Sequence, residues 1–207
     1  MKEIFFKIKN NKAIQLFAIY LRYLIGGAHV FASIVKIKGE EFSTVPVNFS
    51  SYSAFNLFKV LFQSGVYWNF IGWMQILSGF LIMTQVQSTL GSLVLLPISL
   101  NIFFITYSDP SFANTLYIST LMLFANIFFI MLDFDKLIPI ISKKTYFIVQ
   151  NNSFHEKPIW FFLGLLFFIV SIISKILLGS FIQLLIMFIF CLALGLVTIL
   201  FHQKNNE

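Results

Sequence analysis

The sequence AIQLFAIYLRYLIGGAHVFASIVKI, from Ala13 to Ile37, decides the fold class of this chain. A helix of roughly 20 apolar residues, at about 1.5 Å of rise per residue, crosses a hydrocarbon core about 30 Å thick, and this stretch is longer. Arg22 stands nine residues after Ala13, about 14 Å along such a helix, so we expect its guanidinium near the membrane midplane. A charge there costs at least about 2.5 kcal/mol. The stretch therefore predicts a spanning helix whose arginine faces the protein interior and binds a partner or a ligand.

The composition of the whole chain indicates a membrane protein. Of its 207 residues, 58% are hydrophobic and 11% are charged, and a soluble domain of this size lacks the interior to bury so many apolar side chains. The apolar segments are long and continuous, which favours transmembrane helices over the short alternating strands of a β-barrel. The net charge is +6, but the basic residues gather in connecting segments, as membrane orientation requires. We therefore expect the lipid bilayer, and no nucleic acid, as a partner.

Three further apolar segments follow the first one. We predict spans over Tyr67–Gln85, Leu90–Tyr107 and Phe112–Leu132. Because the connections between these segments are short, we expect them to be antiparallel neighbours that form a four-helix bundle with the first span.

The connection before the second span holds a short amphipathic segment. Over residues 53–64, four aromatic or aliphatic side chains fall on one face of a helix: Phe55, Phe58, Leu61 and Phe62. About ten residues are too few to cross the bilayer, so we expect this helix to lie flat at the interface. It is either a packing helix over the mouth of the bundle or a gate.

The C-terminal part is predicted to add two spans. The chain is apolar from Ile159 to Phe201, with Lys175 as its one charge in that stretch, and this length corresponds to about two bilayer crossings. The fold class is thus an all-α membrane protein with a four-helix bundle and a C-terminal transmembrane hairpin. The predicted parts are a membrane core at 1–137, a cytoplasmic linker at 138–157 and the hairpin with its tail at 158–207.

The distribution of lysines predicts the orientation of the six spans. With the N-terminus in the cytoplasm, nine lysines fall on the inner side and four on the outer side, in agreement with the positive-inside rule. Both termini are therefore expected in the cytoplasm, and the lysine-rich residues 1–12 are interpreted as the start of an uncleaved signal anchor. The expected location is the cytoplasmic (inner) membrane of a bacterium.

Four segments, taken in order, resemble the DoxX/DoxD family of small integral membrane proteins. They are an arginine followed by two glycines (Arg22, Gly26 and Gly27), VKIKGEEF at 35–42, GWMQILSGFLIMTQ at 72–85 and LGSLVLLPISLNIF at 90–103. The resemblance covers about residues 13–137. The last two predicted helices lie outside the usual four-helix core of that family.

The resemblance implies a redox-associated role. Better understood members of the family look like subunits of membrane oxidoreductase systems, including thiosulfate-to-quinone electron transfer, and relatives serve as accessory or assembly factors. Many members carry an acidic residue in the second helix, a few positions before a glycine, where this chain has Gln75 ahead of Gly79. An amide at this position weakens any proposal of proton transfer through it.

Polar residues from four predicted spans mark a candidate ligand-binding site: Arg22, Gln75, Asn101 and Asn126. All fall at intermediate depth, so we expect them to face inward around one cavity. We find no carboxylate at that depth, which predicts that Arg22 lacks an ion-pair partner. It either bonds neighbouring amides and helix carbonyls as a structural clasp or donates to a ligand such as an anion or a quinone oxygen.

His29 is a fifth candidate. It lies two turns from Arg22 on the same face of the first span, toward the outer surface. We expect it to bond one of three nearby carboxylates, and the alternative is a proton-active histidine beside a quinone. The carboxylates are Glu40, Glu41 and Asp109.

Several chemistries are excluded by the residues present. Cys191 is the single cysteine, so the chain has neither a CxxC redox pair nor the thiolates of an iron–sulfur cluster. His29, His155 and His202 are predicted at different depths and provide no facing haem ligands. We find no metal-binding motif and expect no metal, so quinone is the one cofactor that the interpretation includes.

Three hypotheses from different classes follow. The first is a cofactor-free accessory subunit of a membrane oxidoreductase system, which interacts with quinone and with a redox protein partner. The second is an assembly or scaffold protein without chemistry of its own. The third is a small-molecule transporter, which is least favoured because the two halves of the chain show no internal repeat.

Overall fold

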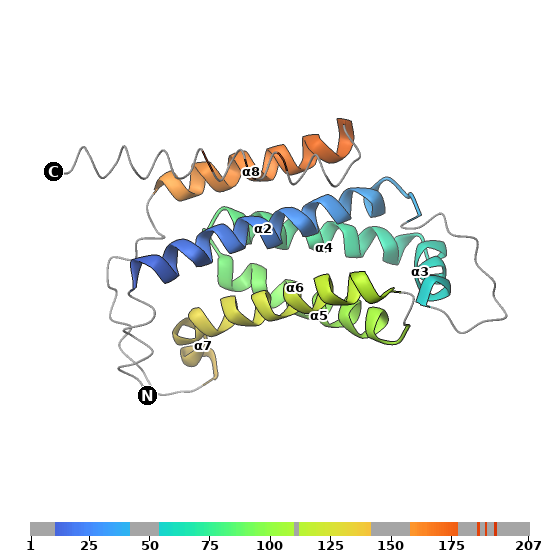
Figure 1. Ribbon diagram of the computed structural model, residues 1–207, viewed down its shortest axis with the longest axis horizontal. Coiled ribbons are helices and arrows are strands. Elements are labelled where there is room, and N and C mark those ends of the chain that lie inside the picture. The colour runs from blue at the N-terminus through green and yellow to red at the C-terminus, as the bar shows by residue number, and fades with distance from the viewer. Residues whose placement is uncertain are drawn as a thin grey trace.

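The computed structural model of the chain describes residues 11–41, 54–109, 112–141 and 158–177, together with residues 186, 189 and 193. Every element in these described ranges is an α-helix (Figure 1). The helices are α2 (Lys12–Ile37), α3 (Ala54–Gln63), α4 (Val66–Met83), α5 (Ser88–Tyr107), α6 (Ala113–Leu132), α7 (Phe134–Ile141) and α8 (Pro158–Leu177).

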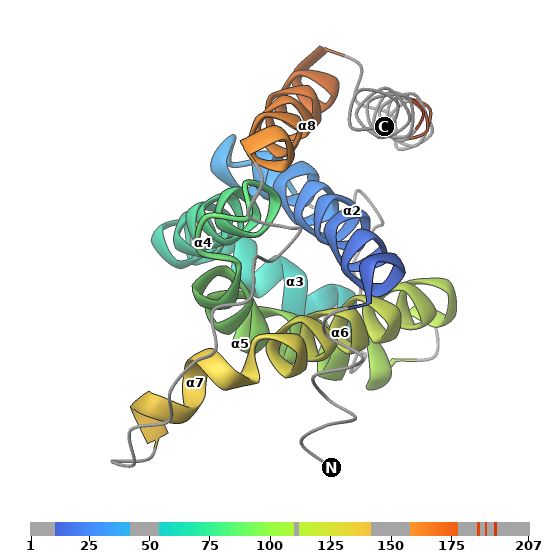
Figure 2. The same ribbon diagram turned by 90° about the vertical axis from the view of Figure 1, so that its left-hand side faces the viewer.

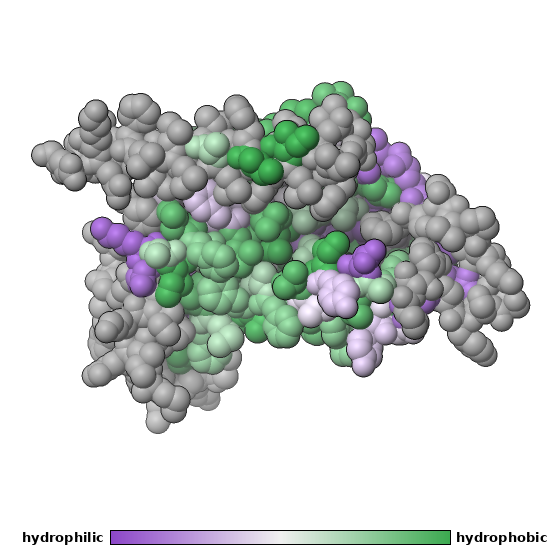
Figure 3. All heavy atoms as spheres, viewed as in Figure 1, coloured by the Kyte–Doolittle hydropathy of each residue, from purple (hydrophilic) through white to green (hydrophobic). Residues whose placement is uncertain are grey.

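Five of the described helices are long and apolar enough to cross a membrane: α2, α4, α5, α6 and α8. Many of their large apolar side chains are exposed, as lipid-facing side chains are. Figure 3 shows hydrophobic residues across the middle of one face, with strongly hydrophilic ones mainly toward its ends. The prediction of an all-α, multi-pass membrane protein is confirmed. The predicted sixth span lies, except for three residues, outside the described part of the chain.

Four helices form the predicted bundle. Helix α2 packs against α4, α4 against α5 and α5 against α6, and α2 closes the ring by touching α6 (Figure 2). The α2–α6 contact includes the rings of Phe17 and Phe128, whose centroids lie 6.1 Å apart. Helix α8 packs outside the ring, against α2 and α4. The Tyr23 hydroxyl anchors it by donating a 2.7 Å hydrogen bond to the Trp160 carbonyl.

Glycines let α2 approach both of its large neighbours closely. A Cβ atom on Gly79 of α4 would stand 2.5 Å from Val30 Cγ2 and 3.0 Å from the carbonyl oxygen of Gly26. Gly27 faces the other way, because a Cβ there would meet Ser171 Oγ of α8 at 3.1 Å. The two adjacent glycines of α2 thus serve different partners, since Gly26 lies against α4 and Gly27 lies against α8.

Two short helices flank the bundle. The predicted helix at 53–64 is present as α3, and its Phe58 and Leu61 pack against Ile105 and Phe112 at one end of the bundle. Helix α7 was not predicted, because the fourth span was expected to end at Leu132 and residues 138–157 were described only as a linker. This helix has only eight residues, which is too few to produce the long apolar pattern that identified the spans.

Candidate functional site

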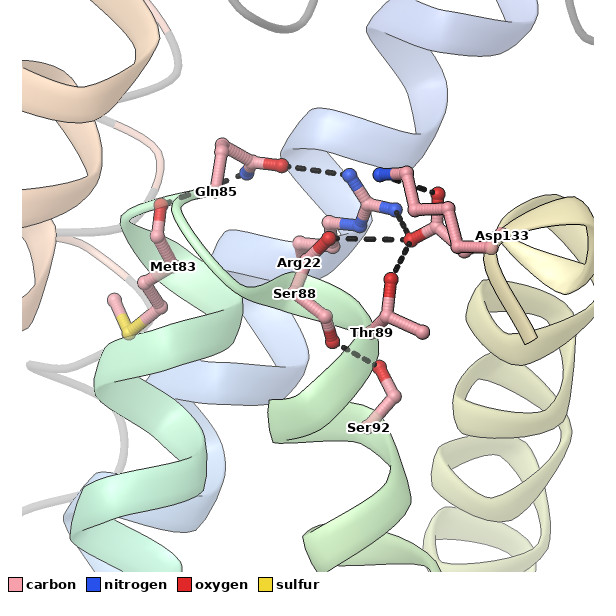
Figure 4. Close-up of polar contacts among 8 residues, drawn as sticks. Arg22, Met83, Gln85, Ser88, Thr89, Ser92 and Asp133 are labelled. Carbon is pink, nitrogen blue, oxygen red and sulfur yellow. Dashed lines mark hydrogen bonds and ion pairs between the residues drawn. The ribbon is translucent and has the colours of Figure 1, made fainter. Parts of the chain in front are cut away.

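Arg22 takes part in a buried ion pair at one end of the bundle. Its Nη2 donates to Asp133 Oδ2 at 2.9 Å and its Nη1 donates to Gln85 Oε1 at 2.7 Å (Figure 4). The prediction that Arg22 lacks an ion-pair partner is therefore wrong. The depth of Arg22 was counted from Ala13, but the first turns of α2 extend beyond the α4–α5 turn, so Arg22 is level with that turn.

The carboxylate of Asp133 is fully used by its neighbours. Its Oδ2 also accepts hydrogen bonds from Ser88 and Thr89 at 3.2 and 3.0 Å, and Lys136 Nζ lies 3.2 Å from Oδ1. Burial alone would raise the pKa of Asp133, but the charges of Arg22 and Lys136 outweigh burial and hold that pKa below its usual value. The group is thus an anion at neutral pH, and it ties together α2, the start of α5 and the end of α6.

A cavity of about 820 Å³ occupies the other half of the bundle. Its walls come from the second half of α2, the first halves of α4 and α6 and most of α5, and α3 borders it with Phe58 and Leu61. The walls are mainly apolar, and the volume falls in the range of small-molecule sites. The polar or charged residues on α2, α4 and α5 that line it are His29, Lys36, Gln75, Ser99, Asn101 and Thr106.

His29 and Gln75 form a buried pair in the wall of this cavity. Gln75 Nε2 lies 3.1 Å from His29 Nδ1, and the two side chains are 0% and 2% exposed respectively. The antiparallel crossing of α2 and α4 produces this pairing, because close approaches of Gly79 to Gly26 and of Gly72 to Ser33 bracket it. The prediction that His29 bonds a carboxylate is wrong, because its hydrogen-bond partner is the amide of Gln75.

Three buried polar atoms of cavity-lining residues have no hydrogen-bond partner within the described chain: His29 Nε2, Gln75 Oε1 and Ser99 Oγ. Such an atom costs about 1–3 kcal/mol when nothing satisfies it. The cavity end of the bundle therefore carries unused hydrogen-bonding capacity beside an empty apolar volume, which is the arrangement of a binding site for a small amphipathic molecule.

The structure does not bring together the four polar residues that were expected to converge. Gln75 and Asn101 both line the cavity, although Asn101 is exposed. Asn126 is fully buried elsewhere, where its Nδ2 donates to the Ser92 carbonyl at 3.2 Å, and Arg22 belongs to the Asp133 cluster. Two of the candidates thus share the cavity with His29, and the other two lie outside it.

Sequence reasoning missed four participants. Asp133 and Gln85 were assigned to helix ends and not to the interior, and Ser99 gave no signal because serines are common in apolar helices. Lys36 also lines the cavity, with Nζ 3.1 Å from the Ala32 carbonyl oxygen and 5.0 Å from the centre of the Trp68 ring. Its position at the apparent end of a span concealed that it is 5% exposed.

Neither family models, nor curated proteins, nor solved structures match this chain. Among the described residues, no group of three or more histidine, cysteine, aspartate or glutamate side chains is placed to hold a metal ion.

Proposed function

We propose that this chain is a DoxX-like, cofactor-free accessory subunit of a membrane oxidoreductase system that binds the headgroup of a quinone. The observation that carries the proposal is the cavity of about 820 Å³ whose wall contains the unpartnered polar atoms of His29, Gln75 and Ser99. Apolar walls suit the ring and the tail of such a molecule, and the polar atoms suit its oxygens. The redox centre itself would belong to a partner protein.

The proposal includes the topology expected from the lysines. It places six spans in a bacterial cytoplasmic membrane with both termini in the cytoplasm. In that orientation the Arg22–Asp133 cluster lies at the cytoplasmic end of the bundle, and the cavity lies in the outer half, beneath α3. Single-cysteine labelling at Gln87 and Gly65, each in a Cys191→Ser background, tests this: only the Gly65→Cys site should react with an impermeant reagent in intact cells.

A scaffold protein is the second candidate, and the Arg22–Asp133 pair favours it. Both terminal nitrogens of this arginine are bonded inside the chain and its counter-ion is Asp133, so a structural role accounts for its charge, although its Nε has no hydrogen-bond partner in the described residues. A scaffold would bind its partner protein without taking up a quinone.

The experiment compares quinone binding by two alanine variants of the purified full-length protein. Ala32 lines the cavity and is half-buried, so Ala32→Phe should fill space that the ligand needs. Ala113→Phe adds the same ring at an exposed position that does not line the cavity. We expect duroquinone (tetramethyl-1,4-benzoquinone) or its hydroquinone to bind the wild type and Ala113→Phe, with affinity lost in folded Ala32→Phe. If the wild type binds neither duroquinone nor its hydroquinone, the quinone-binding proposal is overturned and the scaffold is favoured.

A further inference from the structure

The hydrogen bond between His29 and Gln75 fixes what each side chain has left to offer. An amide nitrogen only donates, so Gln75 Nε2 donates to His29 Nδ1. A neutral imidazole that accepts at Nδ1 carries its proton on Nε2. The unpartnered Nε2 of His29 is therefore a donor, and the unpartnered Oε1 of Gln75 is an acceptor. Both residues line the same cavity, so its wall contains one group of each kind.

Ser99 adds a third group that can act in either way. Its hydroxyl is 3% exposed, has no partner in the described chain and lines the same cavity. A hydroxyl can donate or accept, so it places no demand on the ligand. Gln75 Oε1 is the group that discriminates, because only a ligand with its own O–H or N–H proton can satisfy it.

The two redox forms of a quinone differ in this respect. The oxidised ring carries carbonyl oxygens, which accept from His29 and from Ser99 but leave Gln75 Oε1 without a partner. The reduced ring carries hydroxyl groups, which accept from His29 and also donate to Gln75. We infer that the cavity selects the hydroquinone over the quinone, with Gln75 as the specificity-determining residue. This inference rests on the proposed function.

The expected preference is about tenfold in dissociation constant, which corresponds to one net hydrogen bond of about 1.4 kcal/mol. The test measures binding of duroquinol and of duroquinone to the purified full-length protein under anaerobic conditions. Gln75→Leu should lower the affinity for duroquinol to about that for duroquinone. Gln75→Glu, as a protonated acid, can donate to His29 and still accept from the ligand, so it should keep the preference.

Asn126→Leu is the matched control. Asn126 is also a fully buried amide with an unpartnered oxygen, but it does not line the cavity. Its removal should therefore leave the preference unchanged in folded protein. A loss of preference in this control as well as in Gln75→Leu would overturn the role assigned to Gln75.

A ligand pair provides a test that requires no variant. Tetramethylphenol has one hydroxyl donor, and its methyl ether has the same ring without that donor. We expect the phenol to compete with duroquinol at the wild-type cavity at least tenfold better than the ether. Equal binding of duroquinol and duroquinone, or equal competition by phenol and ether, would overturn the selectivity while the quinone site itself stands. Absence of binding of every probe would overturn the proposed function as well.

Discussion

The two ends of this bundle use buried polar groups in opposite ways. At one end, Arg22 and Asp133 are paired, Arg22 also donates to Gln85, and Asp133 also accepts from Ser88 and Thr89. At the other end, His29 and Gln75 bond each other but leave an atom each without a partner beside a cavity. At the first end the chain supplies the counter-ion of its buried charge, so removal of that counter-ion should destabilise the fold, although Arg22 Nε has no hydrogen-bond partner in the described residues. At the second end, unpartnered polar groups lie in the wall of an empty volume that a ligand could fill.

The largest expected effect is the loss of the carboxylate at the paired end. Asp133→Asn leaves the Arg22 charge buried without its counter-ion, so we expect a loss of about 3–5 kcal/mol in the free energy of unfolding. Titration with a denaturing detergent, followed by circular dichroism, measures it. Lys38→Gln is the control, because it breaks an exposed pair with Glu40 at 4.0 Å and should cost less than about 1 kcal/mol. Equal effects of the two substitutions would show that the buried pair is unimportant.

A smaller effect is expected where α2 and α4 cross, between the two ends. Gly79→Ala places a Cβ atom 3.0 Å from the backbone oxygen of Gly26 and closer still to Val30, so the helices must separate at a cost of about 1–3 kcal/mol. Because this crossing also brings His29 and Gln75 together, ligand affinity should fall with stability. Gly27→Ala meets the movable hydroxyl of Ser171 at 3.1 Å and Met83 Cε at an ordinary contact distance of 3.8 Å, so it should cost less. The same unfolding titration, together with duroquinol binding, compares the two variants.

Acid should weaken the paired end selectively. The pKa of Asp133 is lowered in the folded protein, so its contribution is fully present above the ordinary aspartate pKa of about 4. That contribution is lost as the pH falls through the lower, folded pKa. The free energy of unfolding, measured from pH 6 downward, should therefore decrease more steeply for the wild type than for Asp133→Asn. Parallel curves would contradict the assigned role of this carboxylate.

The smallest expected change in stability comes from removing one serine hydroxyl at each end of the bundle, and its sign should differ between the two ends. Ser99→Ala removes a buried hydroxyl that has no partner, so without ligand it should be neutral or stabilise the fold by up to about 1 kcal/mol. Ser88→Ala removes a hydroxyl that donates to Asp133 and should destabilise by about 1 kcal/mol. Thermal unfolding of the ligand-free variants, side by side, measures the difference. A destabilising Ser99→Ala would mean that the cavity end is already satisfied.

Periodicity and hydropathy predicted four described spans to within about two residues and the start of the fifth to within one, because each span is a continuous apolar segment. Periodicity and hydropathy did not detect α7, because that helix is short, and residue counting placed Arg22 too deep in the membrane. A helix can begin outside the bilayer, so residue counting from the first apolar position overestimates depth. Only the register of α2 against α4 pairs His29 with Gln75, and a register between helices cannot be read from either helix alone.

The central claim is that the cavity end, and not the arginine end, binds the ligand. Photolabelling of the purified protein with an azido-substituted quinone, followed by mass spectrometry of the fragments, tests it most directly. We predict adducts on α2 between Ala28 and Lys36 and on α4 between Tyr67 and Gln75, all suppressed by excess duroquinol. Suppressible adducts confined to the surroundings of Arg22 and Asp133 would contradict the claim.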